Sequence, residues 1–431
     1  MRIPLLLLTL IAAAQAASFS ARFEEIKRHA TPAELYAFLY ALPKGGDLHN
    51  HLGGSARPEW WHAVATDPAR NGGDTFYTRT RFNAVPDTGV TLILYHTLRQ
   101  QGYDALSEIQ KGDYTRLDQL SPEQKQGWLD ALRLERPNEG RDEFFTWIWP
   151  RMGQLHQNLN VVGEVLVEII KAYGAEGMRY LETQVGANGY TRNDGRPIPS
   201  AEAVAYFRTL LARPDAAGSG VTVRFQSTVL RFLPGAELQL EQLYKFVDAN
   251  RDLWVGINMA GIEENNKGHP ARFLAKYREL RRSHPTLALS IHAGEMDGPD
   301  SHIRDTLLLG ASRIGHGLNL IQDPDTLLLL QQTRRVLVEI NLISNRLLEY
   351  TPDLTRHPFP EYLRTGIPVC LNTDDRGMWD SNLTDEYFTA VTTYNLSWDE
   401  LVQLGRNSLA FSFAPPQVKT KLLADYENAV A

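Results

Sequence analysis

The sequence contains only one cysteine, Cys370, among 431 residues. A lone cysteine excludes an intramolecular disulfide, and it also excludes a zinc site built from one histidine and two cysteines. Cys370 lies within the apolar segment 367–371, so we expect its thiol to pack in the core. The cysteine count therefore leaves imidazole and carboxylate groups as candidate zinc ligands.

The sequence also lacks an excess of positive charge and any long run of lysine or arginine. Its 44 Lys and Arg residues against 51 Asp and Glu residues give a formal charge of −7. This balance argues against DNA or RNA as a partner. The hydrophobic share of 43% is that of a globular protein, and the length suits one large domain or two average ones.

The apolar run at the N-terminus, residues 5–14, is too short to cross a bilayer, which takes roughly 20 residues. It follows the positive Arg2 and precedes Ala14-Gln-Ala16, a small-residue cleavage pattern. A buried first helix is the alternative, but a charged segment, 22–29, follows at once. We therefore predict a signal peptide over residues 1–16, so that the mature chain is secreted, or periplasmic in a bacterium.

From residue 160 onward the sequence alternates between strand and helix patterns. With a first strand at 47–52, the predicted strands are 47–52, 178–184, 221–230, 253–259, 287–292, 312–317, 336–342 and 367–373. Strands that alternate with helices at this spacing indicate a parallel sheet with crossover helices. Eight such units are the number that closes a (β/α)8 TIM barrel, which is the α/β fold that we predict.

The segment 53–151 interrupts this alternation directly after the first strand. It is rich in Trp, Tyr and charged residues, and it contains a helix start at Ser121-Pro-Glu-Gln124. A structureless loop of this length is unusual in a compact domain. We predict a largely helical insertion within a single domain that covers residues 17–431.

Residues that can bind a metal or move a proton gather at the predicted strand ends. They are, in chain order, His49, His51, His292, Glu295, His316, Asp374 and Asp375. The strand ends of a barrel open onto one mouth, and side chains at i and i+2 of a strand point to the same face. Such a set suits a catalytic zinc ion with one open position. Each residue alone could instead be a hydrogen-bonded structural residue.

The motifs that carry these residues resemble the adenosine deaminase family of metal-dependent amidohydrolases. The matching segments are 44–52, 255–263, 291–295, 313–317, 338–345 and 371–375. His-x-His alone is common, whereas His-Ala-Gly-Glu, Arg-Ile-Gly-His-Gly and Thr-Asp-Asp in this order are specific. The signal peptide and the insertion are also similar to the secreted adenosine deaminase-related growth factors, although the insertion lacks the cysteine pair of that branch.

The resemblance implies one Zn2+ per chain, held by His49, His51, His292 and Asp374. His316 would act as base and orient the attacking water, and Glu295 would protonate ring N1 of the purine. Asp375 would hydrogen-bond N7, and the backbone N–H of Gly261 would meet N3. The implied reaction is the hydrolytic deamination of adenosine, or a related 6-aminopurine, to inosine and ammonia.

Two positions depart from the family pattern. Gly53 replaces an aspartate that holds the ribose 5′-hydroxyl, so the insertion could supply that contact or the substrate could differ. Arg376 stands where proline is usual; we expect it at the surface, and the alternative is that it reaches an acidic substituent of the ligand. The remaining histidines, His156 and His357 among them, lie in predicted helices or loops and have no assigned chemistry.

Two other functions stay open at this point. One is a barrel amidohydrolase that acts on another amino-heterocycle or on the adenine base. The other is a secreted, non-catalytic binding or growth-factor-like protein, although such a protein would be expected to lose part of the metal or proton-transfer set. The sequence also leaves the oligomeric state open, a homodimer included.

Overall fold

The computed structural model describes residues 19–82, 92–134, 136–263, 267–298 and 300–431. The predicted signal peptide, residues 1–16, lies outside these ranges. Within them, no helix combines the length and the apolar character that crossing a membrane requires.

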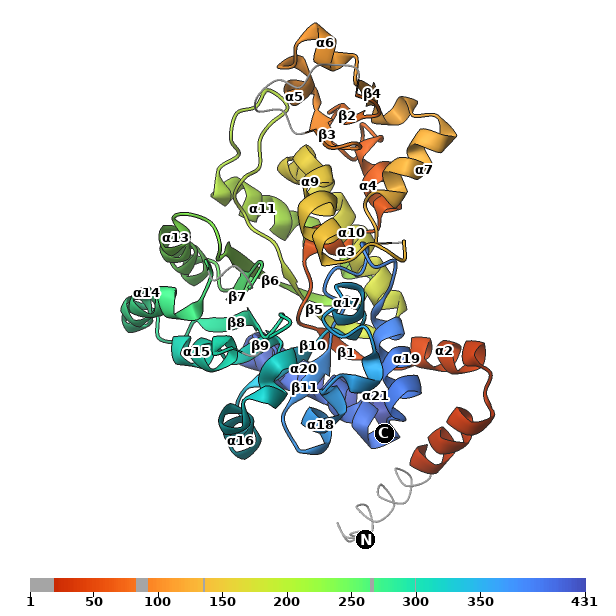
Figure 1. The fold of residues 1–431 in the computed structure, drawn as a ribbon, viewed down its shortest axis with the longest axis vertical. Coiled ribbons are helices and arrows are strands. Elements are labelled where there is room, and N and C mark those ends of the chain that lie inside the picture. Colours follow the sequence, from red (N-terminus) through yellow and green to blue (C-terminus); the bar gives the residue numbers. More distant parts are fainter. Residues whose placement is uncertain (1–18, 83–91, 135, 264–266, 299) are drawn as a thin grey trace.

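Eight parallel strands occupy the centre of the molecule (Figure 1). In sheet order they are β1 (Gly45–Asp47), β5 (Met178–Gln184), β6 (Thr222–Leu230), β7 (Trp254–Ala260), β8 (Ala288–Ala293), β9 (Arg313–His316), β10 (Leu337–Ile340) and β11 (Val369–Leu371). The sheet closes through a bridge between Asn50 and Asp374, beside which the N–H of Asp374 donates to the carbonyl of His49 at 3.0 Å. This topology confirms the predicted (β/α)8 barrel.

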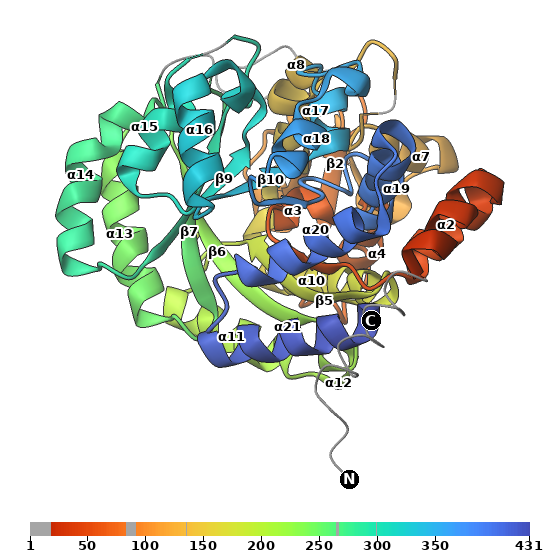
Figure 2. The same cartoon turned by 90° about the horizontal axis from the view of Figure 1, so that it is seen from below.

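Helices surround the sheet and connect its strands (Figure 2). They are α2 (Pro32–Ala41), α10 (Leu159–Ala175), α11 (Ser200–Leu211), α12 (Pro214–Ala217), α13 (Ala236–Ala249), α14 (Pro270–Ser283), α15 (His302–Leu309), α16 (Pro324–Thr333), α17 (Leu342–Leu347), α18 (Phe359–Arg364), α19 (Leu383–Tyr394), α20 (Trp398–Ala410) and α21 (Pro416–Val430). In α10, Asn158 caps the N-terminus by accepting from the N–H groups of Asn160 and Val161. Its apolar residues, such as Leu166 and Ile170, are buried, so packing as well as capping stabilises this helix.

The first strand is shorter than the predicted segment 47–52. β1 ends at Asp47 because its carboxylate accepts from the N–H of His49 at 3.1 Å and from Asn50 Nδ2 at 3.2 Å. This local capture turns the chain out of the ladder, and α3 begins at Leu52. His49 and His51 therefore lie beyond the strand, at the mouth of the barrel.

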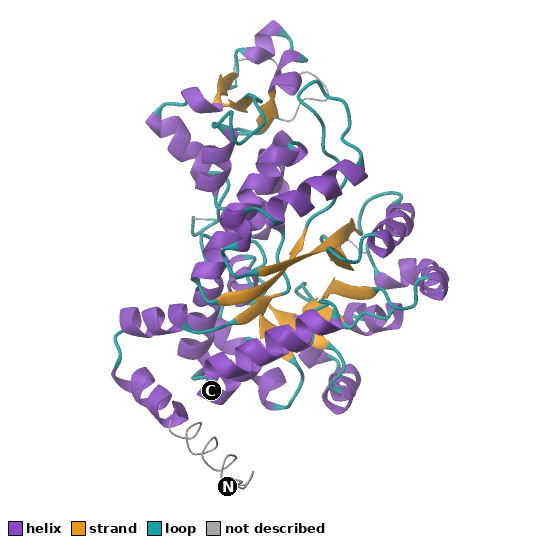
Figure 3. Cartoon of the chain, turned by 180° about the vertical axis from the view of Figure 1, so that it is seen from behind, coloured by secondary structure: helices purple, strands orange, loops and turns teal. Residues whose placement is uncertain are grey.

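The segment between β1 and α10 forms a lobe beside the barrel (Figure 3). Its helices are short: α3 (Leu52–Ser55), α4 (Pro58–Ala65), α5 (Gln100–Asp104), α6 (Glu108–Lys111), α7 (Pro122–Asp130), α8 (Arg141–Glu143) and α9 (Trp149–Met152). The predicted capping box at Ser121 opens α7. The lobe also contains an antiparallel sheet of β2 (Phe76–Arg79), β3 (Thr97–Arg99) and β4 (Tyr114–Arg116). The sequence did not predict this sheet, because strands this short show no clear alternation.

Cys370 is fully buried in β11, as predicted. The prediction for Arg376 was wrong, because this side chain is only 2% exposed. Its guanidinium pairs with Glu176 at 2.7 Å and lies 4.3 Å from the ring centroid of Tyr173. The residue is therefore held inside the protein by a carboxylate that follows α10, a partnership that the local sequence does not reveal.

We expect Arg376→Met to lower the free energy of unfolding by about 3–5 kcal/mol, because it leaves the buried Glu176 carboxylate without its cation. The matched control is Arg208→Met, which breaks an exposed pair with Asp252 at 2.9 Å and should cost less than about 1 kcal/mol. Urea denaturation of both variants measures the difference. Equal losses for the two variants would show that the buried pair has no special importance.

Candidate active site

The barrel mouth brings three of the four predicted metal ligands, His49, His292 and Asp374, together with His316, the predicted base. One ligand atom from each of His49, His292, His316 and Asp374 lies within 4.8 Å of the others. Asp374 Oδ1 lies 3.6 Å from His49 Nε2 and 3.3 Å from His51 Nε2. His51 Nε2 in turn lies 3.3 Å from His292 Nε2. Two imidazoles, His49 and His51, thus lie beside one carboxylate oxygen, and a third, His292, lies beside His51.

Outer hydrogen bonds fix how two of these imidazoles point. His49 Nδ1 lies 2.8 Å from Glu339 Oε2, and His292 Nδ1 lies 2.8 Å from Asn258 Oδ1. Because both partners are acceptors, each Nδ1 carries the hydrogen and each Nε2 presents a lone pair to the cluster. The sequence alone assigned no role to Glu339 or Asn258. Both residues lie in segments that match the family, 338–345 and 255–263, and each lies close to the end of its strand.

The cluster fits a metal ion. His49 Nε2 and Asp374 Oδ1 are buried and have no hydrogen-bond partner among the residues that the structure describes. Unpartnered buried acceptors are costly, and a cation between them would satisfy both. Three imidazoles and one carboxylate, without thiolate, are a ligand set that zinc accepts. The other oxygen of Asp374 is already held by the Ser344 hydroxyl at 2.7 Å.

The electrostatics of the cluster also favour a positive charge. Burial opposes protonation of His49, yet Asp374 and Glu339 outweigh it and raise the pKa of this imidazole to about 10. Burial would raise the pKa of Asp374, but the adjacent imidazoles of His49 and His51 outweigh burial and lower this pKa well below its usual value. At His292, burial first and then the neighbouring imidazoles lower the pKa. A cation bound between His49 Nε2 and Asp374 Oδ1 would replace the proton that His49 otherwise takes up.

Glu295 provides an acid beside the cluster. Burial, followed by the charges of Asp374 and Glu263, raises the pKa of this carboxyl well above its usual value and so favours its protonated form. Its Oε2 lies 3.6 Å from His316 Nε2. The turn that carries it is fixed by Glu263, which accepts from the backbone N–H of Glu295 at 3.2 Å.

His316 is held as a neutral ring with a defined tautomer. Burial, and then the charge of His49, lowers its pKa well below the usual value. His357 Nδ1 accepts from the N–H of Phe359 at 3.0 Å, so its Nε2 donates to Asn345 Oδ1 at 3.1 Å. Asn345 therefore turns its amide nitrogen to His316 Nδ1, 3.1 Å away. Neutral His316 then keeps its hydrogen on Nε2, the atom that faces Glu295.

Two residues of the cluster have left-handed backbone, with φ of 63° at His316 and 54° at Asp374. Each such conformation costs about 1 kcal/mol or more for a residue with a side chain. Gly315 precedes His316, and a Cβ added there would lie 2.6 Å from His49 Cε1. Only glycine at this position lets β9 approach the cluster this closely. The packing around the cluster therefore holds His316 and Asp374 in their left-handed conformations.

The cluster opens into a cavity of about 570 Å³, a volume within the range of small-molecule sites. Asp375 and Gly261, the other predicted site residues, line it. Burial, and then the charge of Asp374, raises the pKa of Asp375 well above its usual value. The lobe between β1 and α10 contributes four aromatic side chains from residues 144–156 to the wall: Phe144, Phe145, Trp149 and His156. His156, which had no assigned chemistry, is thus part of the site.

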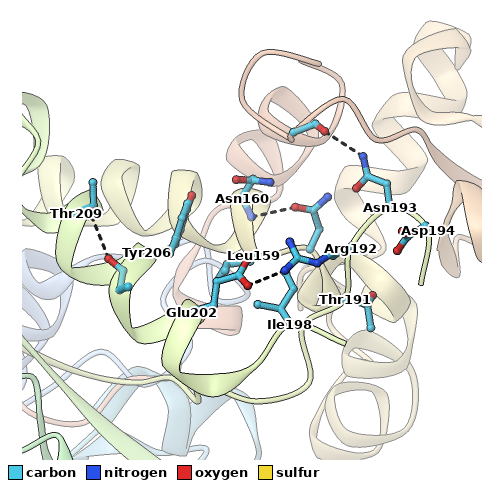
Figure 4. A pocket seen from close by; sticks show the side chains of 13 residues that line it. Leu159, Asn160, Thr191, Arg192, Asn193, Asp194, Ile198, Glu202, Tyr206 and Thr209 are labelled. Atoms are coloured by element: carbon cyan, nitrogen blue, oxygen red, sulfur yellow. Dashed lines mark hydrogen bonds and ion pairs between the residues drawn. The ribbon is translucent and has the colours of Figure 1, made fainter. Parts of the chain in front are cut away.

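A larger hollow of about 750 Å³ lies outside the barrel mouth, between α10, α11 and the loop 191–198 (Figure 4). Its polar residues largely satisfy one another, as Arg192 and Glu202 do at 2.6 Å. It contains none of the clustered imidazoles and carboxylates described above. We therefore place the chemistry in the smaller cavity.

Comparison with known proteins places this geometry in context. A family model described as adenosine deaminase matches residues 121–428. An adenosine deaminase from Enterococcus faecalis is 41% identical over 144 residues, which are 33% of this chain and 42% of that protein. An adenine deaminase from Paraburkholderia phytofirmans is 31% identical over 236 residues, 53% of this chain and 64% of that protein. The matched segments thus span about half the length of these relatives.

The fold is also found among solved structures. A zinc-bound amidohydrolase from Burkholderia ambifaria superposes with a TM-score of 0.65 at 21% identity, covering 92% of both chains. At 21% identity, this similarity supports the barrel fold alone.

Proposed function

Because this chain belongs to the adenosine deaminase family, we propose that it is a zinc-dependent enzyme that deaminates adenosine or a closely related 6-aminopurine nucleoside. The reaction consumes one water and releases inosine and ammonia. The observation that carries this proposal is the gathering of four imidazoles around Asp374 beside Glu295, a buried carboxyl whose pKa is raised by burial.

In this proposal His49, His51, His292 and Asp374 hold one zinc ion. When bound, the ion would lower the pKa of a water molecule towards neutrality and so supply a nucleophile at pH 7. The resemblance assigns His316 the role of base. Its hydrogen-bond network instead favours a hydrogen on Nε2, so we propose that His316 orients the attacking water through that hydrogen.

Glu295 is the proposed proton donor to purine N1. Protonation of N1 withdraws electrons from C6, the carbon at which water adds and from which ammonia leaves. The side chain suits this role because burial keeps its proton in place until a base with a free lone pair arrives. Closure of the cavity around the purine would strengthen this transfer, since water is then excluded.

All three protein groups proposed to contact the purine donate hydrogen bonds to it. N1, N3 and N7 of adenine are acceptors; Glu295 would donate to N1, the N–H of Gly261 to N3 and Asp375 to N7. Asp375 can do so because its raised pKa keeps it protonated. A ring with this pattern of acceptors is therefore favoured over one that presents donors at these positions.

The cavity favours a nucleoside over a nucleotide. Among the described residues that line it, none is lysine or arginine, whereas Glu295, Asp374 and Asp375 are carboxyl groups. A phosphate would thus enter without a cationic partner. The cavity also extends from the cluster to the aromatic side chains of the insertion, which leaves space beyond the base for a sugar.

An ultraviolet assay of zinc-loaded protein tests the proposal with adenosine, adenine and adenosine 5′-monophosphate. We expect turnover of adenosine, with kcat/KM at least roughly tenfold above the value for the other two. Preference for adenine or for the monophosphate would overturn the assignment of a nucleoside. No turnover of any of the three would favour an amidohydrolase of another amino-heterocycle, or a binding protein.

We also propose that residues 1–16 direct export and that residues 17–431 act as one domain. The short apolar run with its small-residue cleavage pattern supports export. Direct packing of the insertion on the cavity, through Trp149 and His156, supports a single domain.

A further inference from the structure

Gly53 leaves a space in the cavity wall, two residues beyond His51. A Cβ added to Gly53 would lie 2.7 Å from His156 Nε2 and 3.0 Å from Trp149 Cζ3. Any side chain at position 53 would therefore collide with the insertion. The imidazole of His156 occupies the volume that a side chain there would need.

The ring of His156 is held in place on two sides. Its centroid lies 5.4 Å from that of Trp61 and 6.0 Å from that of Trp149. Trp61 in turn donates its indole N–H to the carbonyl of Gly53 at 3.3 Å. These contacts fix the imidazole against the backbone of Gly53, so a turn of the ring away from the cavity would disrupt the packing of both indoles.

His156 Nε2 is buried and has no hydrogen-bond partner among the described residues, although the residue lines the cavity. A buried polar atom without a partner is costly, and such an atom in a cavity wall points to a ligand group that completes it. The path from the cluster is short, since the Trp149 ring lies 6.3 Å from that of His51. Because Trp149 also lies 6.0 Å from the ring of His156, one indole separates His156 from the cluster.

We propose that His156 is the specificity-determining residue for the sugar, and that its Nε2 hydrogen-bonds one ribose hydroxyl of a substrate bound in the cavity. This inference rests on the proposed function, because it takes a purine nucleoside as the substrate. Recognition of the sugar then comes from His156, in the part of the lobe that precedes α10, and not from position 53 in the loop after β1.

The charge state of His156 agrees with a neutral sugar. Burial lowers its pKa to about 4, so the ring is uncharged at neutral pH and can share one hydrogen bond with a hydroxyl. Two further cavity atoms, Gln184 Nε2 and Ser227 Oγ, are also buried without a partner. Gln184 lies on β5 and Ser227 on β6, and both atoms are available for other polar groups of the substrate.

The test compares adenosine with its 2′-, 3′- and 5′-deoxy analogues in wild type and in His156→Ala. We expect kcat/KM for adenosine to fall about tenfold or more in the variant. The loss should shrink to within about twofold for the one analogue that lacks the contacted hydroxyl, which is the signature of a direct contact. His156→Gln, which keeps a donor and an acceptor, should recover part of the activity.

His96→Ala is the matched control. His96 is an imidazole of the insertion whose buried Nδ1 has no partner in the described part of the chain, and burial lowers its pKa to about 4, but it does not line the cavity. Its loss should leave the ratios between the four nucleosides unchanged. If His156→Ala folds poorly, the same ratios are read from His156→Gln and His156→Asn.

An equal loss on all four nucleosides, or no loss, would overturn the role of His156 while leaving the proposed function intact. Failure of wild-type protein to deaminate any of them would instead overturn the proposed function. The two failures are thus distinguishable in one set of assays.

Discussion

Glu295→Gln is expected to lower kcat by about 10²–10⁴-fold, the usual contribution of a positioned general acid. Glutamine has nearly the same shape and can still donate a hydrogen bond, but it cannot transfer a proton to purine N1. Burial raises the pKa of Glu295, so the wild-type group carries its proton when substrate arrives. Steady-state kinetics with adenosine measures the loss.

The same variant should keep its metal. Glu295 contacts His316, at 3.6 Å, and is not among the residues proposed to hold zinc. Elemental analysis should therefore find the same metal content as in wild type. Asp297→Asn is the control, because this exposed carboxylate in the same loop pairs only at the surface with Arg141. Metal loss in Glu295→Gln, or wild-type turnover, would show that the proton-donor assignment is wrong.

Asp374→Asn should have the largest effect on metal binding. The carboxylate lies between His49 and His51, and its replacement removes both a negative charge and a ligand. Loss of an outer hydrogen-bond partner typically costs about 10–100-fold in metal affinity, and loss of the ligand itself should cost more. Competition with a chelator measures the affinity, and deamination should be lost in parallel.

Ser344→Ala supplies the graded control for this prediction. Its hydroxyl donates to the other oxygen of Asp374 at 2.7 Å, so it orients the carboxylate without meeting the metal. We expect its affinity for zinc to fall between those of wild type and Asp374→Asn. A variant Asp374→Asn that binds zinc as wild type does would place the metal elsewhere.

The barrel could be predicted because each strand is an apolar run bounded by helical periodicity. β5 (Met178–Gln184) coincides with its predicted range. The cluster residues could be identified because they lie at the ends of such runs or directly after them. What failed depends on contacts between distant segments. β1 ends early because the Asp47 carboxylate accepts a hydrogen bond from the N–H of His49, and Arg376 is buried because Glu176, two hundred residues earlier in sequence, neutralises it.

The residues that tune the site were harder to find than those that form it. Glu339 is the one charged residue in the otherwise apolar strand β10. A carboxylate in such a run is a signal of a buried functional group that the sequence offers. His357 and Asn345 set the tautomer of His316 through hydrogen bonds that no spacing rule predicts. His156 reaches the cavity only because the insertion folds back over Gly53, which is a tertiary fact without a local pattern.

The most direct test of a metal-assisted nucleoside deaminase is the quantity of ammonia and inosine formed from adenosine by zinc-loaded protein, with Glu295→Gln protein as the blank. The account predicts the two products in equal amounts, formed at least about a hundredfold faster by wild type than by the variant. Equal rates for wild type and variant, or loss of adenosine without ammonia, would contradict it.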